Sequence, residues 1–243
     1  MTVEAEWLNP NATPSIADCE VHVWRASLDL PPDKLNALEE TLRQDEHGRA
    51  KRFISGQDRS HFIAARGILR NILGTYLGVL PQSIQFSYGH NGKPAIPSEG
   101  SVHPLRFNLS HSHGIALIGI SREREVGVDV ELIRPEVAGE EIAIRYFSDK
   151  EFEELRNLPA GMKAEGFFRC WTRKEAYIKA RGGGLRIPLK SFSVSLTIRA
   201  QEVLRSPDHI DWCLQSLEPG FGYAGALVME GNNMKVRSLS WVR

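Results

Sequence analysis

Two long stretches of the chain repeat their apolar residues every three or four positions, which is the period of a helix with one buried face. They cover residues 58–77 and about 163–180. Glycine follows each stretch, at Gly78 and at Gly182, and glycine readily takes the left-handed conformation that ends many helices. We therefore expect two long helices that pack on a core, one in each half of the chain.

Shorter segments alternate apolar and polar residues, or are apolar throughout, as strands do. We predict strands at residues 21–24, 84–88, 107–110, 115–121, 126–133, 192–198, 222–229 and 236–242. Shorter helices are expected from about residue 33 and over residues 140–146 and 148–156. Helices and strands thus occur in both halves, which predicts an α+β protein.

The two halves resemble each other after their long helices. Residues 80–86 and residues 187–193 each carry a proline near the start, followed by a serine and apolar residues. We interpret this likeness as duplication of an α+β unit, with the joint near residues 122–126. The predicted fold is two similar α+β halves, residues 1–124 and 125–243, with the active site in the cleft between them, where small-molecule pockets tend to lie.

Composition and charge limit the class of partner. Hydrophobic residues make up 42% and charged residues 25% of the 243 residues, as in an ordinary globular protein. Thirty basic side chains balance thirty acidic ones, so nothing in the net charge attracts nucleic acid or an anionic membrane, and an anionic ligand needs a local cluster of cations. The first residues lack a secretory signal, and the longest apolar run, residues 115–120, is too short to span a bilayer. We expect a cytoplasmic protein.

Asp129 and Glu131 lie in the strand predicted over residues 126–133. Side chains two residues apart in a strand point to the same face, so both carboxylates can meet one cation. A hard cation such as Mg²⁺ or Mn²⁺, which prefers oxygen ligands, would relieve the repulsion between the two like charges. The alternative, that both are ordinary carboxylates on a solvated strand face, stays open.

A second group of candidate residues lies on the helix predicted over residues 163–180. Glu175 and Lys179 are one turn apart on it, and Lys174 precedes Glu175. Glu175 can supply a third oxygen ligand, and the two lysines can hold phosphate oxygens, which is an arrangement suited to phosphoryl transfer. An ordinary Glu–Lys pair is the alternative.

Ser110 and His111 lie at the end of the strand predicted over residues 107–110. Both side chains can hydrogen-bond to a phosphate or a nucleotide. A zinc site that uses His113 and a Ser–His nucleophile are the alternatives, but no cysteine or third histidine has suitable spacing for zinc.

The last candidate group is basic. Arg59, Arg66 and Arg70 lie along one side of the helix predicted over residues 58–77, and Lys93 follows the turn at residues 89–92. Together these cations can form an anion pocket in spite of the zero net charge. A solvated helix face is the alternative.

Taken in this order, the segments resemble the surfactin-type 4′-phosphopantetheinyl transferases. The resemblance is carried by Asn91-Gly92-Lys93-Pro94, Phe107-Asn108-Leu109-Ser110-His111-Ser112, Gly127-Val128-Asp129-Val130-Glu131 with Pro135, Phe147-Ser148, Trp171-Thr172-Arg173-Lys174-Glu175-Ala176-Tyr177-Ile178-Lys179 and Gly182-Gly183-Gly184-Leu185. One segment alone is a weak signal, but the ordered set is specific. It covers about residues 50–195, and the chain length agrees with family members built from two halves.

The resemblance implies transfer of the 4′-phosphopantetheine moiety of coenzyme A to a serine of an apo acyl or peptidyl carrier protein, with release of adenosine 3′,5′-bisphosphate. It also implies Mg²⁺, held by Asp129, Glu131 and Glu175. Glu175 or a metal-bound water would deprotonate the carrier serine, and Lys179 would stabilise the pyrophosphate. The implied coenzyme A contacts are Arg66, Lys93, Ser110, His111, Lys174 and Lys179.

Glu46 departs from the family pattern, because a lysine is expected near this position. A chain with two halves already contains the interface that shorter relatives form between subunits, so the resemblance implies a monomer. The alternative function is a module that binds coenzyme A and carrier protein without turnover. A nucleic-acid-binding protein is disfavoured by the zero net charge.

Overall fold

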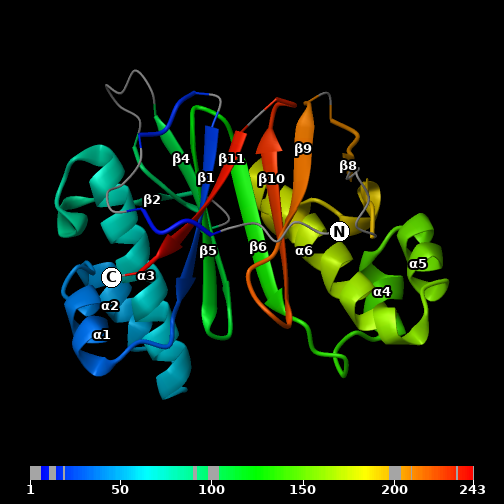
Figure 1. Ribbon diagram of the computed structural model, residues 1–243, viewed down its shortest axis with the longest axis horizontal. Helices are drawn as coiled ribbons and strands as arrows, with labels where there is room; N and C mark the ends of the chain where they lie inside the picture. The colour runs from blue at the N-terminus through cyan, green and yellow to red at the C-terminus, as the bar shows by residue number, and fades with distance from the viewer. Residues whose placement is uncertain are drawn as a thin grey trace.

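A computed structural model shows the arrangement of the elements (Figure 1). It describes residues 7–10, 15–18, 20–89, 92–97, 104–196, 204–208, 210–233 and 235–242. Over these residues, no helix has the length and apolar character that a membrane crossing requires.

The first sheet has four strands in the order β11-β1-β5-β4. They are β1 (Glu20–Ser27), β4 (Leu105–Ser112), β5 (Ile115–Arg122) and β11 (Lys235–Trp241). Strand β5 runs antiparallel to β1 and β4, whereas β11 lies parallel to β1. Helix α3 (Gly56–Leu77) packs its apolar side on this sheet and closes the first core.

The second sheet has three antiparallel strands in the order β6-β10-β9. They are β6 (Val126–Leu132), β9 (Trp212–Leu217) and β10 (Tyr223–Glu230). Helix α6 (Lys163–Arg181) packs on this sheet and closes the second core. Each half therefore presents one long helix on one sheet, as the apolar periodicity predicts.

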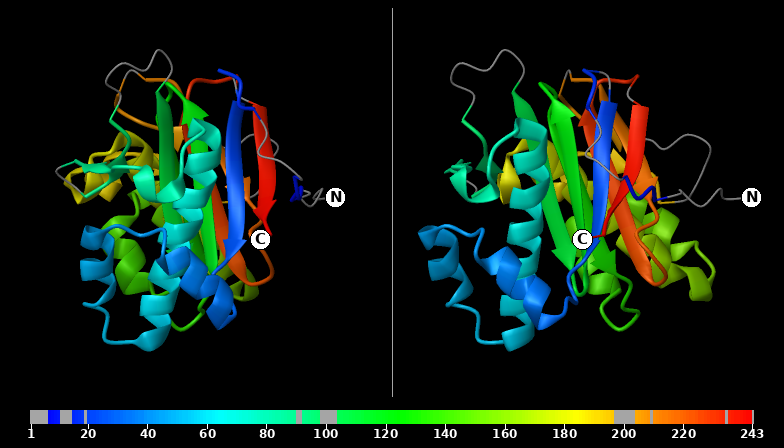
Figure 2. Two further views of the ribbon diagram at one scale, coloured as in Figure 1. Left: turned by 90° about the vertical axis from the view of Figure 1, so that its left-hand side faces the viewer. Right: turned by 60° about the vertical axis from the view of Figure 1, so that its left-hand side comes forward.

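The two sheets meet between the two long helices, so the layers follow the order helix, sheet, sheet, helix (Figures 1 and 2). Val21 and Leu117 of the first sheet share a third apolar core with Val128 and Leu227 of the second sheet. Strands β4 and β6 pack side by side where the two sheets meet. This edge brings residues of both halves together and positions the site described below.

Short helices and strands complete the two halves. The helices are α1 (Pro32–Glu39), α2 (Gln44–Ala50), α4 (Glu140–Tyr146) and α5 (Asp149–Arg156), and the 3-10 turns are η1 (Pro81–Ser83), η2 (Ala160–Met162), η3 (Gly184–Arg186) and η4 (Leu189–Ser191). The short strands are β2 (Ser87–Tyr88), β3 (Pro94–Ala95), β7 (Ser193–Val194) and β8 (Leu204–Arg205).

The α+β class, both long helices and most of the strands are confirmed. The strand predicted over residues 84–88 is wrong for most of its length, because only Ser87–Tyr88 pairs with a neighbouring strand. Ile84 is instead buried in the first core, and Phe86 packs against that core outside any strand. Of the strand predicted over residues 192–198, only Ser193–Val194 is confirmed, and residues 197–198 lie outside the described residues.

Strand β11 belongs to the first sheet although its residues come last in the chain. It pairs with β1 along its whole length, from Lys235 to Trp241, and Leu239 is fully buried in the first core. The division into residues 1–124 and 125–243 stays a prediction, and the first sheet draws on both sides of it.

Candidate active site

Helix α6 lies close to strand β6 because Gly127 has no side chain. A Cβ atom at this position would lie 2.0 Å from the carbonyl oxygen of Ala176 and 2.3 Å from the backbone nitrogen of Ala180. Asp129 and Glu131 follow Gly127 at intervals of two residues, so they share its face of the strand. The close approach of the helix brings its polar side chains onto these carboxylates.

Asp129, Lys179 and Ser110 form a polar cluster where β4, β6 and α6 meet. The Lys179 Nζ lies 2.6 Å from the Asp129 Oδ1 and donates to the Ser110 Oγ over 2.8 Å. Ser110 donates to the same Asp129 oxygen over 2.8 Å. In the described part of the chain, the buried Oδ2 of Asp129 has no hydrogen-bond partner. An unsatisfied buried acceptor is costly, which makes this oxygen a candidate ligand atom.

Glu131 and Glu175 add two further carboxylates to this region. Ser112 donates to the Glu131 Oε2 over 2.8 Å. Burial raises the pKa of Glu131, and the charge of Asp129 raises it further. Burial likewise raises the pKa of Glu175, with added effects from Asp129 and Glu131. The three carboxylates therefore lie close enough to repel one another.

The residue types at this site fit a hard divalent cation. All three carboxylates offer oxygen ligands, the Asp129 Oδ2 is unpartnered, and a cation would relieve the mutual repulsion. Among the described residues, no three acidic, histidine or cysteine side chains are arranged around a single point as metal ligands are. Lys179 supplies the positive charge beside Asp129 in this arrangement.

A cavity of about 520 Å³ opens beside α2 and α3. Its walls are formed by Asp45, Glu46, Arg49, Arg52, Phe53, Phe62, Arg66 and Tyr88. The Arg49 guanidinium lies 5.5 Å from the centre of the Phe62 ring. Cations and aromatic faces thus line one cavity, and such walls suit a ligand with phosphate groups and a planar base.

Arg66 reaches this cavity, but its charge is already paired. Its Nε and Nη2 lie 2.7 and 2.6 Å from the Oε1 of buried Glu46, and Nη2 donates to the Tyr88 hydroxyl over 3.0 Å. Arg70, one turn further along α3, is fully buried and pairs with the same carboxylate. The prediction of a shared anion-binding face for these arginines is therefore wrong for Arg70, because its side chain is buried against Glu46 and is not part of the cavity wall.

His111 and Lys93, both from the first half, lie near Lys179 of the second half. Partial desolvation by the surrounding protein lowers the pKa of His111, and the charges of Lys179 and Arg49 lower it further. The Lys93 Nζ donates to the backbone carbonyl of Lys179 over 2.8 Å and lies 3.2 Å from the Glu125 carboxylate. Burial lowers the pKa of Lys93. The second half thus contributes Lys179 to a region that Lys93 and His111 of the first half also approach.

Comparison with known proteins identifies the family. A model of the N-terminal part of 4′-phosphopantetheinyl transferases matches residues 24–122, and a model of the 4′-phosphopantetheinyl transferase superfamily matches residues 125–228. The chain is 40% identical to the 4′-phosphopantetheinyl transferase HetI of Nostoc, over 93% of this chain and 94% of the relative. The chain belongs to the 4′-phosphopantetheinyl transferase family. The prediction of two transferase halves in one α+β chain is thereby confirmed.

A further relative agrees with this assignment, and a solved structure is similar to part of the chain. The transferase is 33% identical to the 4′-phosphopantetheinyl transferase psf-1 of Bacillus pumilus, over 79% of this chain and 81% of the relative. A crystal structure of a holo-(acyl-carrier-protein) synthase from Bacillus anthracis in complex with CoA covers 44% of this chain and 94% of its own, at 23% identity and a TM-score of 0.39. The transferase moves phosphopantetheine from coenzyme A to carrier proteins, as the resemblance implies.

The predicted phosphate contact of Lys174 is wrong. The Lys174 Nζ lies 2.7 Å from the Glu151 carboxylate and donates to the carbonyls of Leu189 and Phe192 over 2.7 and 2.9 Å. Lys174 and Glu151 are both fully buried. The lysine therefore points into the second core, away from solvent and from any phosphate, because its helix position faces α5 and η4.

Sequence reasoning missed two residues that organise this region. Glu151 was not singled out, although Ser148 and Glu151 match the serine and glutamate spacing of a helix capping box. Asn108 lies in one of the segments that carry the family resemblance, but the sequence assigns it no role. In the structure, its Oδ1 accepts the backbone N–H of Val128 over 2.9 Å. Nothing in the sequence marks this contact, since it depends on β4 and β6 lying side by side.

Proposed function

We propose that this transferase uses Mg²⁺, with Mn²⁺ as a substitute, to move 4′-phosphopantetheine onto a serine hydroxyl of an apo acyl or peptidyl carrier protein. Adenosine 3′,5′-bisphosphate is the second product. The observation that carries the proposal is the buried group in which Asp129 holds one unpartnered oxygen beside Lys179 and Ser110. We also propose a monomer, because both halves of the site lie in one chain, and we propose that it acts in the cytoplasm.

The three carboxylates would hold the metal. Asp129, Glu131 and Glu175 supply the oxygen ligands, and a bound metal supplies positive charge for the pyrophosphate oxygens. Ser112 holds one oxygen of Glu131 and so fixes this side chain. Lys179 brings a second positive charge to the same region and can stabilise the charge that develops on the leaving phosphate.

Transfer is an in-line displacement at the phosphorus that carries the pantetheine. The serine oxygen forms a new bond to this phosphorus, and the bond from phosphorus to the bridging pyrophosphate oxygen breaks. The bridging oxygen and its electron pair leave with adenosine 3′,5′-bisphosphate. The serine proton passes to the carboxylate of Glu175, which serves as the general base in this proposal.

The nucleotide end of coenzyme A would occupy the cavity beside α2 and α3. Lys93, Ser110 and His111 of the first half are proposed to contact its phosphates. Arg66 bonds to Glu46 and Tyr88, and these three residues form part of the cavity wall that would contact the nucleotide. Arg49 and Phe62 supply a cation and an aromatic face to the same cavity.

Intact-mass spectrometry tests the reaction. Several apo carrier proteins, one from each class of fatty-acid, polyketide and non-ribosomal-peptide synthesis, are incubated with the protein, coenzyme A and Mg²⁺, with EDTA in a parallel sample. We expect a gain of one phosphopantetheine that EDTA removes. A gain that persists in EDTA would contradict the requirement for a metal. No gain on any carrier would favour the alternative, a module that binds coenzyme A and carrier protein without turnover.

Substitution of two carboxylates tests the assigned roles. We expect Asp129→Asn and Glu175→Gln each to lower the transfer rate by about 100-fold or more, because each removes a proposed ligand of the metal that stabilises the transition state. Glu153→Gln, at an exposed carboxylate of α5, is the matched control and should transfer at the wild-type rate. Circular dichroism checks that each variant is folded. Full activity of either site variant would overturn its role.

A further inference from the structure

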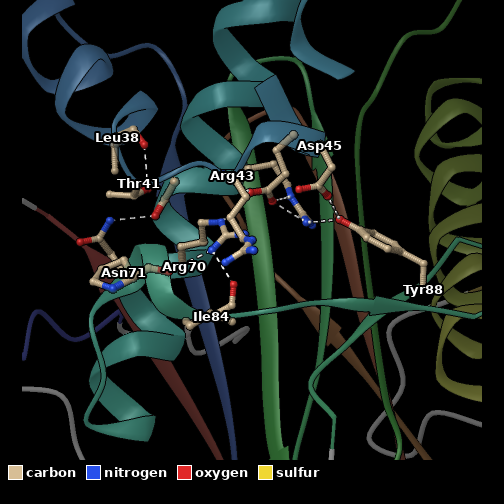
Figure 3. Close-up of polar contacts among 12 residues, drawn as sticks. Leu38, Thr41, Arg43, Asp45, Arg70, Asn71, Ile84 and Tyr88 are labelled. Atoms are coloured by element: carbon tan, nitrogen blue, oxygen red, sulfur yellow. Dashed lines mark hydrogen bonds and ion pairs between the residues drawn. The ribbon is translucent and has the colours of Figure 1, made fainter. Parts of the chain in front are cut away.

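A buried ion pair in the first half joins three elements. Glu46 on α2 accepts the Arg70 Nε over 2.6 Å and the backbone N–H of Arg43 over 3.1 Å. Arg70 on α3 also donates to the carbonyls of Pro81 and Ile84 over 2.9 and 3.1 Å, as Figure 3 shows for Ile84. The pair ties α2, α3 and η1 together, and we call it the first lock.

A second buried ion pair joins three elements of the other half. Glu151 on α5 accepts the Lys174 Nζ and the backbone N–H of Ser148, both over 2.7 Å. Lys174 on α6 also donates to the carbonyls of Leu189 and Phe192 over 2.7 and 2.9 Å. The pair ties α5, α6 and η4 together, and we call it the second lock.

The two locks have the same construction. In each, the glutamate is the third residue of the short helix before the long one and also accepts the backbone N–H that precedes its own helix. In each, the cation of the long helix binds two carbonyls at a 3-10 turn after that helix and lies over a phenylalanine ring, 4.9 Å from Phe86 or 4.4 Å from Phe192. All four charged residues are at most 2% exposed.

Each lock lies directly beside one part of the site. In the first half, Glu46 also pairs with Arg66, and α2 carries Arg49, so the lock fixes two walls of the nucleotide cavity. In the second half, Lys174 immediately precedes Glu175 and lies on the helix that carries Lys179. The second lock therefore fixes the rotation of α6 at the residues that face the carboxylate site.

We infer that the two locks are one device present in each half, and that their residues are positioning residues with separate tasks: the first lock sets the coenzyme A cavity, and the second sets the acidic site. This inference rests on the proposed function. Glu46, which departs from the family pattern, is on this inference the counterpart of Glu151. Lys174, which was expected to contact phosphate, is the counterpart of Arg70.

Steady-state kinetics with varied coenzyme A separates the two tasks. We expect Glu151→Gln and Lys174→Met to lower kcat about tenfold or more while the KM for coenzyme A changes less than twofold. We expect Glu46→Gln and Arg70→Met to raise this KM about tenfold while kcat changes less than threefold. Lys174→Arg and Arg70→Lys keep the charge and should recover most of each loss. Arg156→Met, which breaks an exposed ion pair on α5, is the control.

Two binding measurements do not depend on turnover. Mn²⁺ binding, followed by electron paramagnetic resonance without coenzyme A, should weaken in the second-lock variants and stay unchanged in the first-lock variants. Calorimetric titration with coenzyme A should show the reverse. These readouts distinguish failure of the locks from failure of the proposed function, because wild-type protein without transfer activity would still report binding in both experiments.

Loss of folding is controlled by a variant that replaces both partners. A buried pair that loses one partner leaves an uncompensated charge, whereas apolar replacement of both is often tolerated. Glu151→Leu combined with Lys174→Met should fold, as judged by circular dichroism, and keep the kcat loss. The inference is overturned if both sets of variants change the same parameter equally, or if activity follows the melting temperature alone.

Discussion

At the scale of single residues, desolvation shifts the pKa of several groups away from their ordinary values. Burial raises the pKa of Glu131 and Glu175 and lowers the pKa of His22. In each case desolvation disfavours the charged form. The two carboxylates retain charge only at a cost, which a cation at the site would reduce. His22 lies away from that site, so its effect on stability can be measured separately.

We expect the free energy of unfolding to fall as the pH drops below 6.5, in part because of His22. Its side chain is fully buried and bonds to the Tyr76 hydroxyl over 2.5 Å. The pKa of His22 is lower in the folded chain, so the unfolded chain binds the proton first as the pH falls. Proton binding therefore stabilises the unfolded chain, and the free energy of unfolding rises with pH through this range.

Urea unfolding at pH 7.5 and 5.5 tests this prediction. His22→Gln should lose less stability between the two pH values than the wild type does. His47→Gln, at a histidine whose side chain is 37% exposed, should behave like the wild type. An unchanged pH dependence in His22→Gln would show that the proton uptake occurs elsewhere.

Local rules predict some site residues and fail for others. The two-residue alternation of a strand is enough to place Asp129 and Glu131 on one face, and helix spacing places Glu175 with Lys179. Lys174 was misassigned because its partner, Glu151, lies on another helix, and the sequence does not state how α5 packs on α6. Arg70 was misassigned for the same reason, since Glu46 is its distant partner.

At the scale of elements, the packing of α6 on β6 decides the geometry of the site. Long helices and central strands were predicted because their apolar period is sustained, whereas α2 was missed because QDEHGRA has no apolar period and contains Gly48. Strand β9 was missed because WCLQSL does not alternate regularly. The sequence patterns that predict α6 and β6 do not show that the backbone of α6 lies against Gly127.

We expect Gly127→Ala to destabilise the protein by about 1–3 kcal/mol, because the new Cβ has to displace the backbone of α6. Glu175 and Lys179 would move with the helix, so kcat should fall more than the KM for coenzyme A rises. Chemical denaturation and transfer kinetics measure both effects.

Gly48→Ala is the matched control for this substitution. Nothing lies within 4 Å of a Cβ at Gly48, which sits inside α2, so alanine should stabilise the protein by about 0.5–1 kcal/mol through helix propensity. Equal effects at the two glycines would contradict a close-packing role for Gly127.

At the scale of the whole molecule, side-chain hydrogen bonds and a returning strand join the two halves in addition to the apolar core that the two sheets share. Asn108, Ser110 and Ser112 of β4 bond to residues of β6 and so connect the two sheets through side chains. Strand β11 crosses back and completes the first sheet beside β1. The sequence predicts the joint near residues 122–126 but not this return, because parallel pairing between distant segments leaves no local signal.

We expect Leu239→Ala, on the last strand, to weaken the first half of the molecule. Leu239 is fully buried in the first core, and loss of a buried leucine costs about 2–5 kcal/mol. Val242→Ala, at a side chain that is 71% exposed, should change stability by less than about 0.5 kcal/mol. Hydrogen exchange with mass spectrometry then locates the loss. If the two halves open separately, amides of α3 should lose more protection than amides of α6. Equal loss in both helices would show that the molecule opens as one cooperative unit. That result would contradict the division of the chain between residues 124 and 125.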